Sequence, residues 1–404
     1  MPKISAANKK TSLKLTPQTK LSLFCFVIMA VLVVMLLIKS NILSSPFNLN
    51  RSGGVITTTA LKKILNREEL VLINVHTPYE GEISNTDLFV EYDSVKASEE
   101  RLPKDKNTEI VLYCKSGAMS EQALVTFRDL GYTNVSHLKG GMDRWVEDGE
   151  KVLDLAQLPL EVLPEEGFTL PVSWGNLGPK LIELGVIDEV KFTETIQMTD
   201  SEKDILTNGT ESGIVINSQN SQFVVDLLWA LGLAQRSLAY EEGPMGKEYK
   251  NEVGNFASTG GWNLAKGDAV QYLNKFDLVG LNSDQQRRVA EIAKNVFRPC
   301  CGNSTWFPDC NHGMAALAAI ELMVAQNLSD EEVYKNVLKL NSFWFPSNYL
   351  TNATYYARQG VSWQEVDAKE VLGSKYSSGK GAADIAKKVG PLPYNESSGG
   401  SCGA

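Results

Sequence analysis

Short apolar runs alternate with amphipathic stretches over the first part of the chain that follows residue 52. Runs of apolar and β-branched residues bounded by turn residues predict buried strands at residues 70–75, 110–114 and 134–138. Apolar side chains recur at helical spacing at residues 57–66 and 121–130. Strands that alternate with helices predict an α/β domain at residues 53–150, built on a parallel sheet with helices on both faces.

Beyond residue 170 the apolar positions follow helical spacing, most clearly at residues 221–234 and 283–297. Ser283, Ser329 and Ser362 each open a capping-box pattern that signals a helix start. We therefore predict a mostly α-helical domain that is large enough for its own core. The predicted parts are a proline-containing linker at 151–170, the helical domain at 171–390 and a flexible Gly/Ser/Cys tail at 391–404.

The longest apolar run covers residues 21–39 and ends at Lys39. As a helix, its 18 residues before Lys39 would span about 27 Å, enough to cross the hydrocarbon core of a bilayer. Lysines in the basic segment 1–20 predict a cytoplasmic N-terminus. We expect a single-pass membrane protein with a spacer at 40–52, the lipid bilayer as a partner, and the bulk of the chain extracytoplasmic. A cleaved signal peptide is the alternative.

Composition is ordinary for globular protein, and the charge is unevenly distributed. The net charge is −9, and the first 40 residues hold six lysines and no acidic residue. The remainder is therefore more acidic than the whole, which argues against nucleic acid as a partner. Six cysteines in 404 residues are too few for a disulfide scaffold, so their placement matters more than their number.

Cys114 stands where a predicted buried strand passes into a predicted helix. The loop after it contains Lys115, Ser116, Gly117, Ala118 and Met119. We expect the backbone N–H groups of this loop and the positive end of the helix to face the sulfur, with the charge of Lys115 nearby. Such surroundings favour a thiolate, so Cys114 is the candidate nucleophile.

Three stretches together resemble the rhodanese family. They are Ile110-Val-Leu-Tyr-Cys-Lys-Ser-Gly-Ala-Met-Ser120, Val71-Leu-Ile-Asn-Val-His-Thr-Pro-Tyr-Glu80 and Gly140-Gly-Met-Asp-Arg-Trp145. The resemblance covers residues 53–150 and implies a sulfurtransferase whose Cys114 carries a sulfane sulfur as a persulfide, without a cofactor. The loop at 114–119 has the six-residue length of the sulfurtransferases, whereas the related phosphatases have a longer loop.

The sequence departs from the family pattern at three positions. Met119 stands where an arginine is often found, and Asn74 and His76 replace the usual Asp and Arg of the earlier strand. Loss of the loop arginine puts thiosulfate in doubt as the sulfur donor, because a small dianion is best held by a fixed cationic fork. A domain that only binds, with Cys114 as a relic, is the alternative to an enzyme.

A second group of chemically active residues lies between two predicted helices: Cys300, Cys301, Cys310 and His312. Three thiols and an imidazole could bind zinc or copper. Two features limit that hypothesis, since neighbouring cysteines point apart and the Cys-x-His spacing is short. Thiol redox or sulfur-accepting chemistry is the second hypothesis. A structural bridge from Cys310 to Cys300 or Cys301 is the third.

We therefore expect a membrane-anchored rhodanese-like sulfurtransferase with a sulfane sulfur donor and a thiol acceptor as partners. Candidate acceptors on the same chain are Cys300, Cys301, Cys310 and Cys402 in the tail. The alternative is a catalytically weak rhodanese-like binding module, fused to a metal-binding or thiol-redox helical domain that serves in maturation or assembly.

Overall fold

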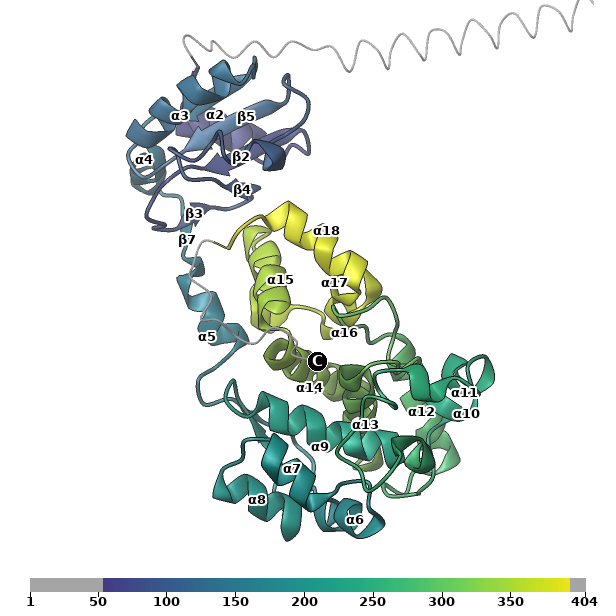
Figure 1. The fold of residues 1–404 in the computed structure, drawn as a ribbon. Coiled ribbons are helices and arrows are strands. Elements are labelled where there is room, and N and C mark those ends of the chain that lie inside the picture. The colour runs from purple at the N-terminus through teal and green to yellow at the C-terminus, as the bar shows by residue number, and fades with distance from the viewer. Residues whose placement is uncertain (1–53, 393–404) are drawn as a thin grey trace, which may run out of the picture. The chain divides into compact units, whose positions relative to one another are not determined.

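A computed structural model describes residues 54–392, and in it an α/β region precedes a helical region (Figure 1). The α/β region, residues 54–153, contains a five-stranded sheet in the order β1-β6-β5-β2-β4, in which all neighbouring strands are parallel. The predicted parallel sheet is therefore confirmed. Its strands are β1 (Val55–Ile56), β2 (Leu70–Asn74), β4 (Leu88–Phe89), β5 (Glu109–Tyr113) and β6 (Val135–Leu138).

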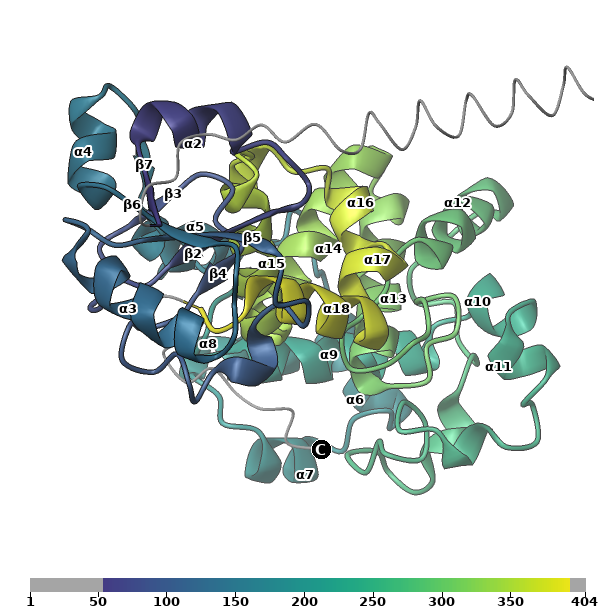
Figure 2. The ribbon, with the colours of Figure 1, turned by 90° about the horizontal axis from the view of Figure 1, so that it is seen from above.

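Helices cover both faces of this sheet, because side chains alternate along each strand. In Figure 2, α2 (Thr58–Ile64) and α4 (Gly141–Glu147) lie on one side of the strands and α3 (Ala118–Asp129) lies on the other. From β5, Ile110 and Leu112 pack in the core cluster of α3, whereas Val111 and Tyr113 pack in the cluster of α2 and α4. A short antiparallel pair, β3 (Glu82–Ile83) with β7 (Val152–Leu153), lies beside the main sheet.

The helical region, residues 155–392, is built around two buried helices, α9 (Ser221–Ala234) and α13 (Asn311–Ala325), which pack on each other. Both helices are apolar on nearly every side, as expected for a core position. The other longer helices are α6 (Leu177–Leu184), α7 (Glu189–Thr195), α8 (Asp200–Thr207), α12 (Ser283–Lys294), α14 (Asp330–Trp344), α15 (Pro346–Arg358) and α18 (Gly379–Val389).

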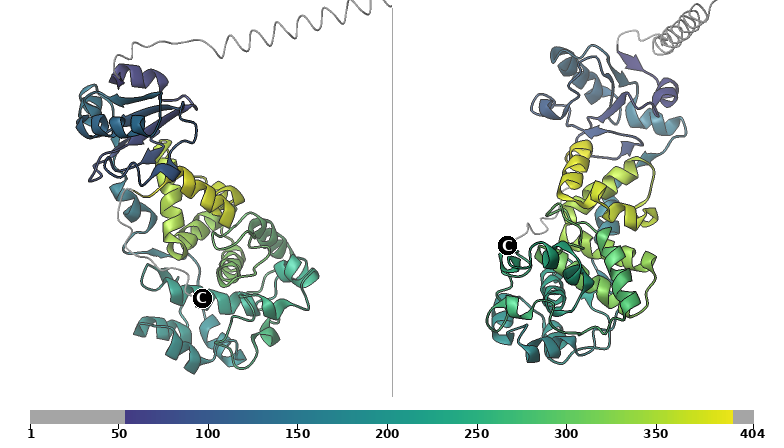
Figure 3. Two further views of the ribbon diagram at one scale, coloured as in Figure 1. Left: turned by 45° about the horizontal axis from the view of Figure 1, so that its top comes forward. Right: turned by 90° about the vertical axis from the view of Figure 1, so that its right-hand side faces the viewer.

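Short elements complete the helical region, and some fall within the predicted linker. Helix α18, at the yellow end of the chain in Figure 3, contacts β4 of the α/β region. The short helices are α5 (Leu158–Val162), α10 (Leu238–Glu241), α11 (Pro244–Lys247), α16 (Ala368–Leu372) and α17 (Ser374–Ser377). The strands β8 (Phe168–Thr169) and β9 (Val215–Ile216) form an antiparallel pair.

The helix start signals were predicted with mixed accuracy. The capping box at Ser329 is present, and the helix predicted at 221–234 coincides with α9. Helix α12 begins one residue earlier than predicted, because Asn282 rather than Ser283 is its N-cap and pairs with Gln285. Ser362 opens only a 3₁₀ turn, in which its hydroxyl donates to the Glu365 carboxylate at 2.9 Å.

The predicted membrane location is corrected by the structure. Across residues 54–392 every helix is too short or too polar to cross a bilayer. The apolar helices α9 and α13 have 14 and 15 residues. These lengths correspond to about 21 to 23 Å, less than the roughly 30 Å of a bilayer core. The segment predicted to span the membrane, residues 21–39, lies outside the described residues, as do the spacer and most of the tail.

Candidate functional site

Cys114 lies directly after β5, and its sulfur accepts hydrogen bonds from two backbone amides. The N–H of Gly117 donates at 3.1 Å and the N–H of Ser120 at 3.4 Å. Gly117 is the N-cap of α3 with a φ of +97°, a conformation that glycine adopts readily. The sulfur therefore lies at the positive end of the α3 dipole, in a cradle that stabilises negative charge.

The Cys114 side chain is also enclosed. The residue is 1% exposed and packs in the same apolar cluster as Ile110, Leu112 and Ala123. Met119, which replaces the arginine of the family pattern, is half-buried against that cluster. Ser116 and Ala118 are exposed on the outside of the loop. Because the sulfur is this enclosed, the site suits a small sulfur donor.

The charge of Lys115 is paired with a carboxylate. Its ammonium group forms an ion pair with the Glu80 carboxylate, and both side chains are largely exposed. The hydrogen bond with Glu80 raises the pKa of Lys115, and the same bond lowers the pKa of Glu80. His76 Nε2 lies 3.6 Å from the other Glu80 oxygen. The Cys114 sulfur therefore depends on backbone amides rather than on this side-chain cation.

The paired glycines of the Gly140-Gly-Met stretch hold the Cys114 loop in place. At the start of α4, Met142 N–H donates to the Cys114 carbonyl and Asp143 N–H donates to the Lys115 carbonyl, both at 2.9 Å. Gly141 has a φ of +57°, and a Cβ added to it would lie 2.2 Å from the Cys114 carbonyl oxygen. Only glycine allows this close approach of α4 to the loop.

Ser120 and His137 belong to the Cys114 site and were not singled out from the sequence as site residues. The Ser120 hydroxyl donates to the Gly117 carbonyl at 3.0 Å and lies 3.5 Å from His137 Nδ1. Burial lowers the pKa of His137, which favours the neutral imidazole. Ser120 could have been anticipated, because the first backbone N–H groups of a helix lack intrahelical partners.

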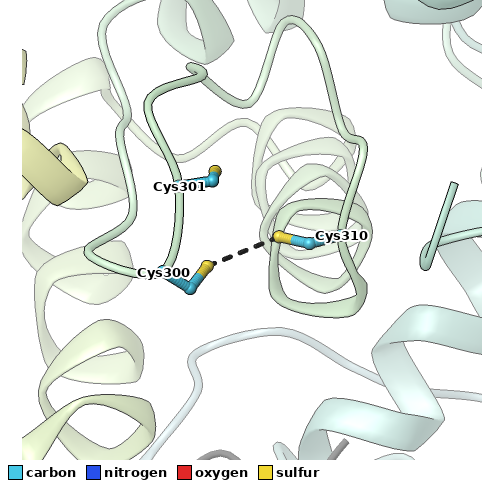
Figure 4. A group of neighbouring side chains, drawn as sticks. All are labelled: Cys300, Cys301 and Cys310. Atoms are coloured by element: carbon cyan, nitrogen blue, oxygen red, sulfur yellow. Dashed lines mark hydrogen bonds between the residues drawn. The ribbon is translucent and has the colours of Figure 1, made fainter.

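The second cluster brings three thiols together in the helical region (Figure 4). The Sγ atoms of Cys300, Cys301 and Cys310 all lie within 4.8 Å of one another, and those of Cys300 and Cys310 are 3.6 Å apart. All three are free thiols. The expectation that the side chains of Cys300 and Cys301 point apart is wrong, because these residues lie in a turn rather than in an extended chain.

Cys310 occupies a position like that of Cys114. It is the N-cap of α13, and the Gly313 N–H donates to its sulfur at 3.3 Å. Hydrogen bonds from the Cys300 and Cys301 thiols lower the pKa of Cys310 strongly, and Arg298 and the Gly313 amide act in the same direction. The hydrogen bonds with its neighbours raise the pKa of Cys300. The pair therefore favours a thiolate on Cys310 beside a protonated Cys300.

A buried arginine accompanies these thiols. The Arg298 side chain is 0% exposed and donates to the Cys301 sulfur at 3.2 Å and to the Asp309 carboxylate at 2.9 Å. Burial alone would lower the pKa of Arg298, but Cys310 and its other anionic neighbours raise it. A Cβ on Gly313 would lie 2.6 Å from the guanidinium carbon, so glycine makes room for the arginine.

His312 lies near the thiols but is not spaced to share a metal ion with them, as it was predicted to be. Its ring packs on Phe345, with the centroids 4.5 Å apart, and lies edge-on to Trp344. Burial lowers the pKa of His312 to about 4. Over the described residues, the group spaced to hold a metal ion contains the three cysteines without this histidine. Their spacing fits a soft metal such as zinc or copper, whose sulfur ligands lie roughly 3.8 Å apart. Cys402 lies outside the described residues.

Comparison with known proteins places the α/β region in a known family. Residues 57–148 match the family described as Rhodanese-like domain. A Sulfurtransferase from Allochromatium vinosum is 33% identical over 92 residues, which are 22% of this chain and 82% of that protein. A tRNA uridine(34) hydroxylase from Erwinia tasmaniensis is 27% identical over 112 residues, 26% of this chain and 32% of that protein. The chain thus spans about a third of the length of such relatives.

Part of the chain is also similar to a solved structure. A rhodanese-related protein from Thermoplasma volcanium covers 24% of this chain and is itself covered to 96%, with 22% identity and a TM-score of 0.22. The family match lies within the α/β region. The helical region, with its three-thiol cluster, lies outside the residues that the family match covers.

Proposed function

We propose a sulfur-transfer function from the premise that this chain belongs, through residues 57–148, to the rhodanese-like domain family. In this proposal the Cys114 thiolate attacks the outer sulfur of a persulfide or polysulfide. A new S–S bond forms on Cys114, the S–S bond of the donor breaks, and the donor leaves as a thiolate. An acceptor thiolate then attacks the outer sulfur of the Cys114 persulfide, and Cys114 is released unchanged.

The observation that carries this proposal is the pair of amide hydrogen bonds on the Cys114 sulfur. Gly117 and Ser120 donate from the start of α3, where the helix dipole also favours an anion. These groups favour the thiolate that attacks and the persulfide anion that results. The backbone provides them, so they are in place before the donor arrives and need no reorganisation.

The same surroundings restrict the sulfur donor. Lys115 is paired with Glu80, and Met119 replaces the family arginine, so no side-chain cation is directed at the sulfur within this described loop. A thiosulfate dianion would lack a fixed cationic fork. An organic persulfide carries a single negative charge, and a polysulfide spreads its charge over several sulfur atoms. The terminal sulfur of either is small enough to pass a loop that leaves Cys114 only 1% exposed. We therefore propose them as the donor class.

The acceptor in this proposal is a thiol, and those of the same chain are included. Cys300, Cys301 and Cys310 are all free thiols, and Cys402 lies in the tail. If one of them reaches Cys114, the transfer is intramolecular and proceeds at an effective concentration of about millimolar. Transfer within one chain would be independent of protein concentration, whereas transfer to a separate thiol would not.

Mass spectrometry of the reduced full chain, after brief incubation with polysulfide, tests the proposal. The Cys114 peptide should gain the mass of one sulfur atom, and the Cys114→Ser chain should lose this product. Cys310→Ser is the matched control, since it removes a thiol at another helix N-terminus and should leave the Cys114 product intact. Sulfur on other thiols with none on Cys114 would rule the function out.

A binding function is the second candidate, and the burial of Cys114 favours it. In this alternative the α/β region docks a partner, and the three thiols hold zinc or copper(I). Metal analysis of the full chain separates the candidates. The binding module would be favoured by one equivalent of tightly held zinc or copper that is lost on Cys310→Ser, together with a Cys114 that never gains sulfur.

A further inference from the structure

A cavity of about 530 Å³ opens beside the three-thiol cluster in the helical region. Its volume lies within the usual range of small-molecule sites. Cys300, Cys310 and His312 line it, whereas Cys301 does not. The cavity thus joins two thiols to a space that is large enough for an organic molecule.

Aromatic side chains form much of the cavity wall. Trp229 and Trp262 meet edge to face with centroids 4.8 Å apart. Each donates its indole N–H to a backbone carbonyl, so these two residues offer the cavity ring surface rather than hydrogen-bond donors. Trp344 also lines the cavity, and its buried indole N–H has no partner. Such walls favour a ligand with an apolar or aromatic group, and the Trp344 N–H is left to donate to a polar atom of that ligand.

A carboxyl group gives the cavity a polar side. Asp226 is 3% exposed, and Gln222 donates to it at 2.9 Å. Burial raises the pKa of Asp226 to about 6. At neutral pH this group is largely ionised and would attract a hydrogen-bond donor or a cationic substituent. The expected ligand therefore combines an aromatic or aliphatic body with a donor group.

The two thiols at the cavity differ in their surroundings. Cys310 lies at the start of α13, a 15-residue helix, where it accepts the Gly313 N–H. Cys300 is exposed and its sulfur lies 3.6 Å from that of Cys310. The side-chain rotation needed to join the two sulfurs is small. This is the arrangement of an attacking thiol and a resolving thiol, with Cys301 held aside by Arg298.

We propose that this cavity is a second active site, in which Cys310 and Cys300 reduce a small organic disulfide with an aromatic or apolar group. The Cys310 thiolate attacks one sulfur of the substrate, an enzyme–substrate disulfide forms, and the other half leaves as a thiolate that takes a proton. Cys300 gives up its proton and attacks Cys310 Sγ, which releases the second half. The substrate gains two electrons, the enzyme holds a Cys300–Cys310 disulfide, and an external dithiol reduces it again.

Two observations favour this chemistry over a metal site. His312 packs on Phe345 and does not complete the ligand set. The Arg298 guanidinium already places a buried positive charge 3.2 Å from the Cys301 sulfur, where it would repel a divalent cation. A purely structural bridge, in turn, would not account for a cavity at which both sulfurs are reachable.

The test uses the full chain with Cys25, Cys114 and Cys402 replaced by serine, so a failure of sulfur transfer at Cys114 cannot affect it. The probe is a bis-pyridyl disulfide, whose released thione absorbs light. The reduced chain should release two thiones rapidly and form a Cys300–Cys310 disulfide. A further Cys300→Ser substitution should limit the rapid phase to one thione, with the adduct on Cys310. A further Cys310→Ser substitution, made instead, should slow thione release at least about tenfold.

Two matched controls separate the cavity from simple thiol reactivity. Cys301→Ser should slow the rapid phase far less than Cys310→Ser does, because Cys301 does not line the cavity and serine keeps a hydroxyl that can donate to Cys310. Ala257→Trp alters an exposed position on the cavity lining and should not disturb folding. It should slow the pyridyl probe by about tenfold and leave the small aliphatic disulfide cystamine unaffected.

Several outcomes would overturn the proposal. These are a first adduct on Cys300 or Cys301, an unchanged rate after Cys310→Ser, or equal slowing of both probes by Ala257→Trp. A Cys300–Cys310 disulfide that an external dithiol cannot reduce would instead indicate a structural bridge. One tightly bound equivalent of zinc or copper that is lost on Cys310→Ser would indicate a metal site.

Discussion

The α/β region and the helical region each place a cysteine sulfur at the start of a helix, but the two sulfurs have different neighbours. The Gly117 amide donates to Cys114 at 3.1 Å, and the Gly313 amide donates to Cys310 at 3.3 Å. Cys114 has a second amide, from Ser120, and is enclosed by an apolar core. Cys310 has a second thiol at 3.6 Å and a cavity.

This difference separates two kinds of sulfur chemistry. A helix start stabilises a sulfur anion in both regions. A lone, enclosed thiol such as Cys114 can hold one extra sulfur, and among residues 54–392 it has no second thiol beside it with which to close a disulfide. A paired thiol beside a cavity can break an S–S bond and then release the product. The surroundings of each thiolate, rather than its helix, therefore determine the chemistry we propose for it.

The largest effect is expected from an ion pair that joins the two regions. Arg358 of α15 donates to Glu82 of β3 at 2.7 Å, and both side chains are buried. Arg358→Met should lower the free energy of unfolding by about 3 to 5 kcal/mol, because it leaves Glu82 buried without its partner. Denaturant unfolding measures this change.

The matched control for that pair is Arg67→Met, which removes a longer and more exposed pair with Glu109. It should cost less than about 1 kcal/mol. Equal effects of the two substitutions would mean that the regions do not depend on each other for stability, and each thiol site could then be studied as an independent domain.

A somewhat smaller effect is expected from the buried cation of the thiol cluster. Arg298→Met should slow the reaction of Cys310 with a disulfide by about tenfold to a hundredfold, because the sulfur anions lose their buried countercharge. Arg298→Lys keeps a charge but loses the forked geometry and should give an intermediate rate. Thione release measures both variants, and an unchanged rate for Arg298→Met would refute the role of this cation.

The helix that carries Cys310 also contains a pH-sensitive residue, Glu321. Burial raises its pKa to about 8, so the folded chain binds a proton there that the unfolded chain releases above about pH 4.5. This contribution to stability is complete below pH 4.5 and is lost as the pH rises through 8. A rise in pH from 6 to 8 should therefore lower the free energy of unfolding by about 2 kcal/mol.

Glu321→Gln removes the titrating group and should flatten this pH dependence. Denaturant unfolding at pH 6 and pH 8 provides the measurement for both chains. The α/β thiol site should not change in either chain, so persulfide formation on Cys114 serves as the internal reference. An equally steep loss of stability in the variant would show that other groups are responsible.

The smallest effect is expected at Lys115, despite its position next to Cys114. Its charge is paired with Glu80 at the surface, so Lys115→Met should change the free energy of unfolding by less than about 1 kcal/mol. Persulfide formation on Cys114 should change less than about threefold, because the backbone amides remain. A loss of tenfold or more would mean that the lysine leaves Glu80 and assists the chemistry.

The α/β region was the more predictable of the two from sequence. Its strands and helices follow local patterns, and the position of Cys114 between β5 and α3 could be inferred from residues 110–130 alone. Of the two amide donors, Gly117 lies in the loop that was predicted to face the sulfur, whereas Ser120 was not named. The predicted loop ended at Met119, whereas the second donor is Ser120 within α3.

The thiol cluster was predictable in composition but not in geometry. Three of its four proposed members do come together. His312 does not, because Phe345 at the end of α14 provides a ring to pack on, and this contact depends on tertiary structure. Burial of Arg298 beneath Gly313 and the adjoining cavity arise in the same way, from segments far apart in the sequence.

One peptide map tests the central claim that the two thiolates perform different chemistry. Separate samples of the reduced wild-type chain are treated with polysulfide and with the pyridyl disulfide. The mass of each cysteine-containing peptide is then measured by mass spectrometry. We expect one added sulfur on Cys114 after the first reagent, and a Cys300–Cys310 disulfide without a stable adduct after the second. Added sulfur that avoids Cys114, or the same product at both helix starts, would contradict the account.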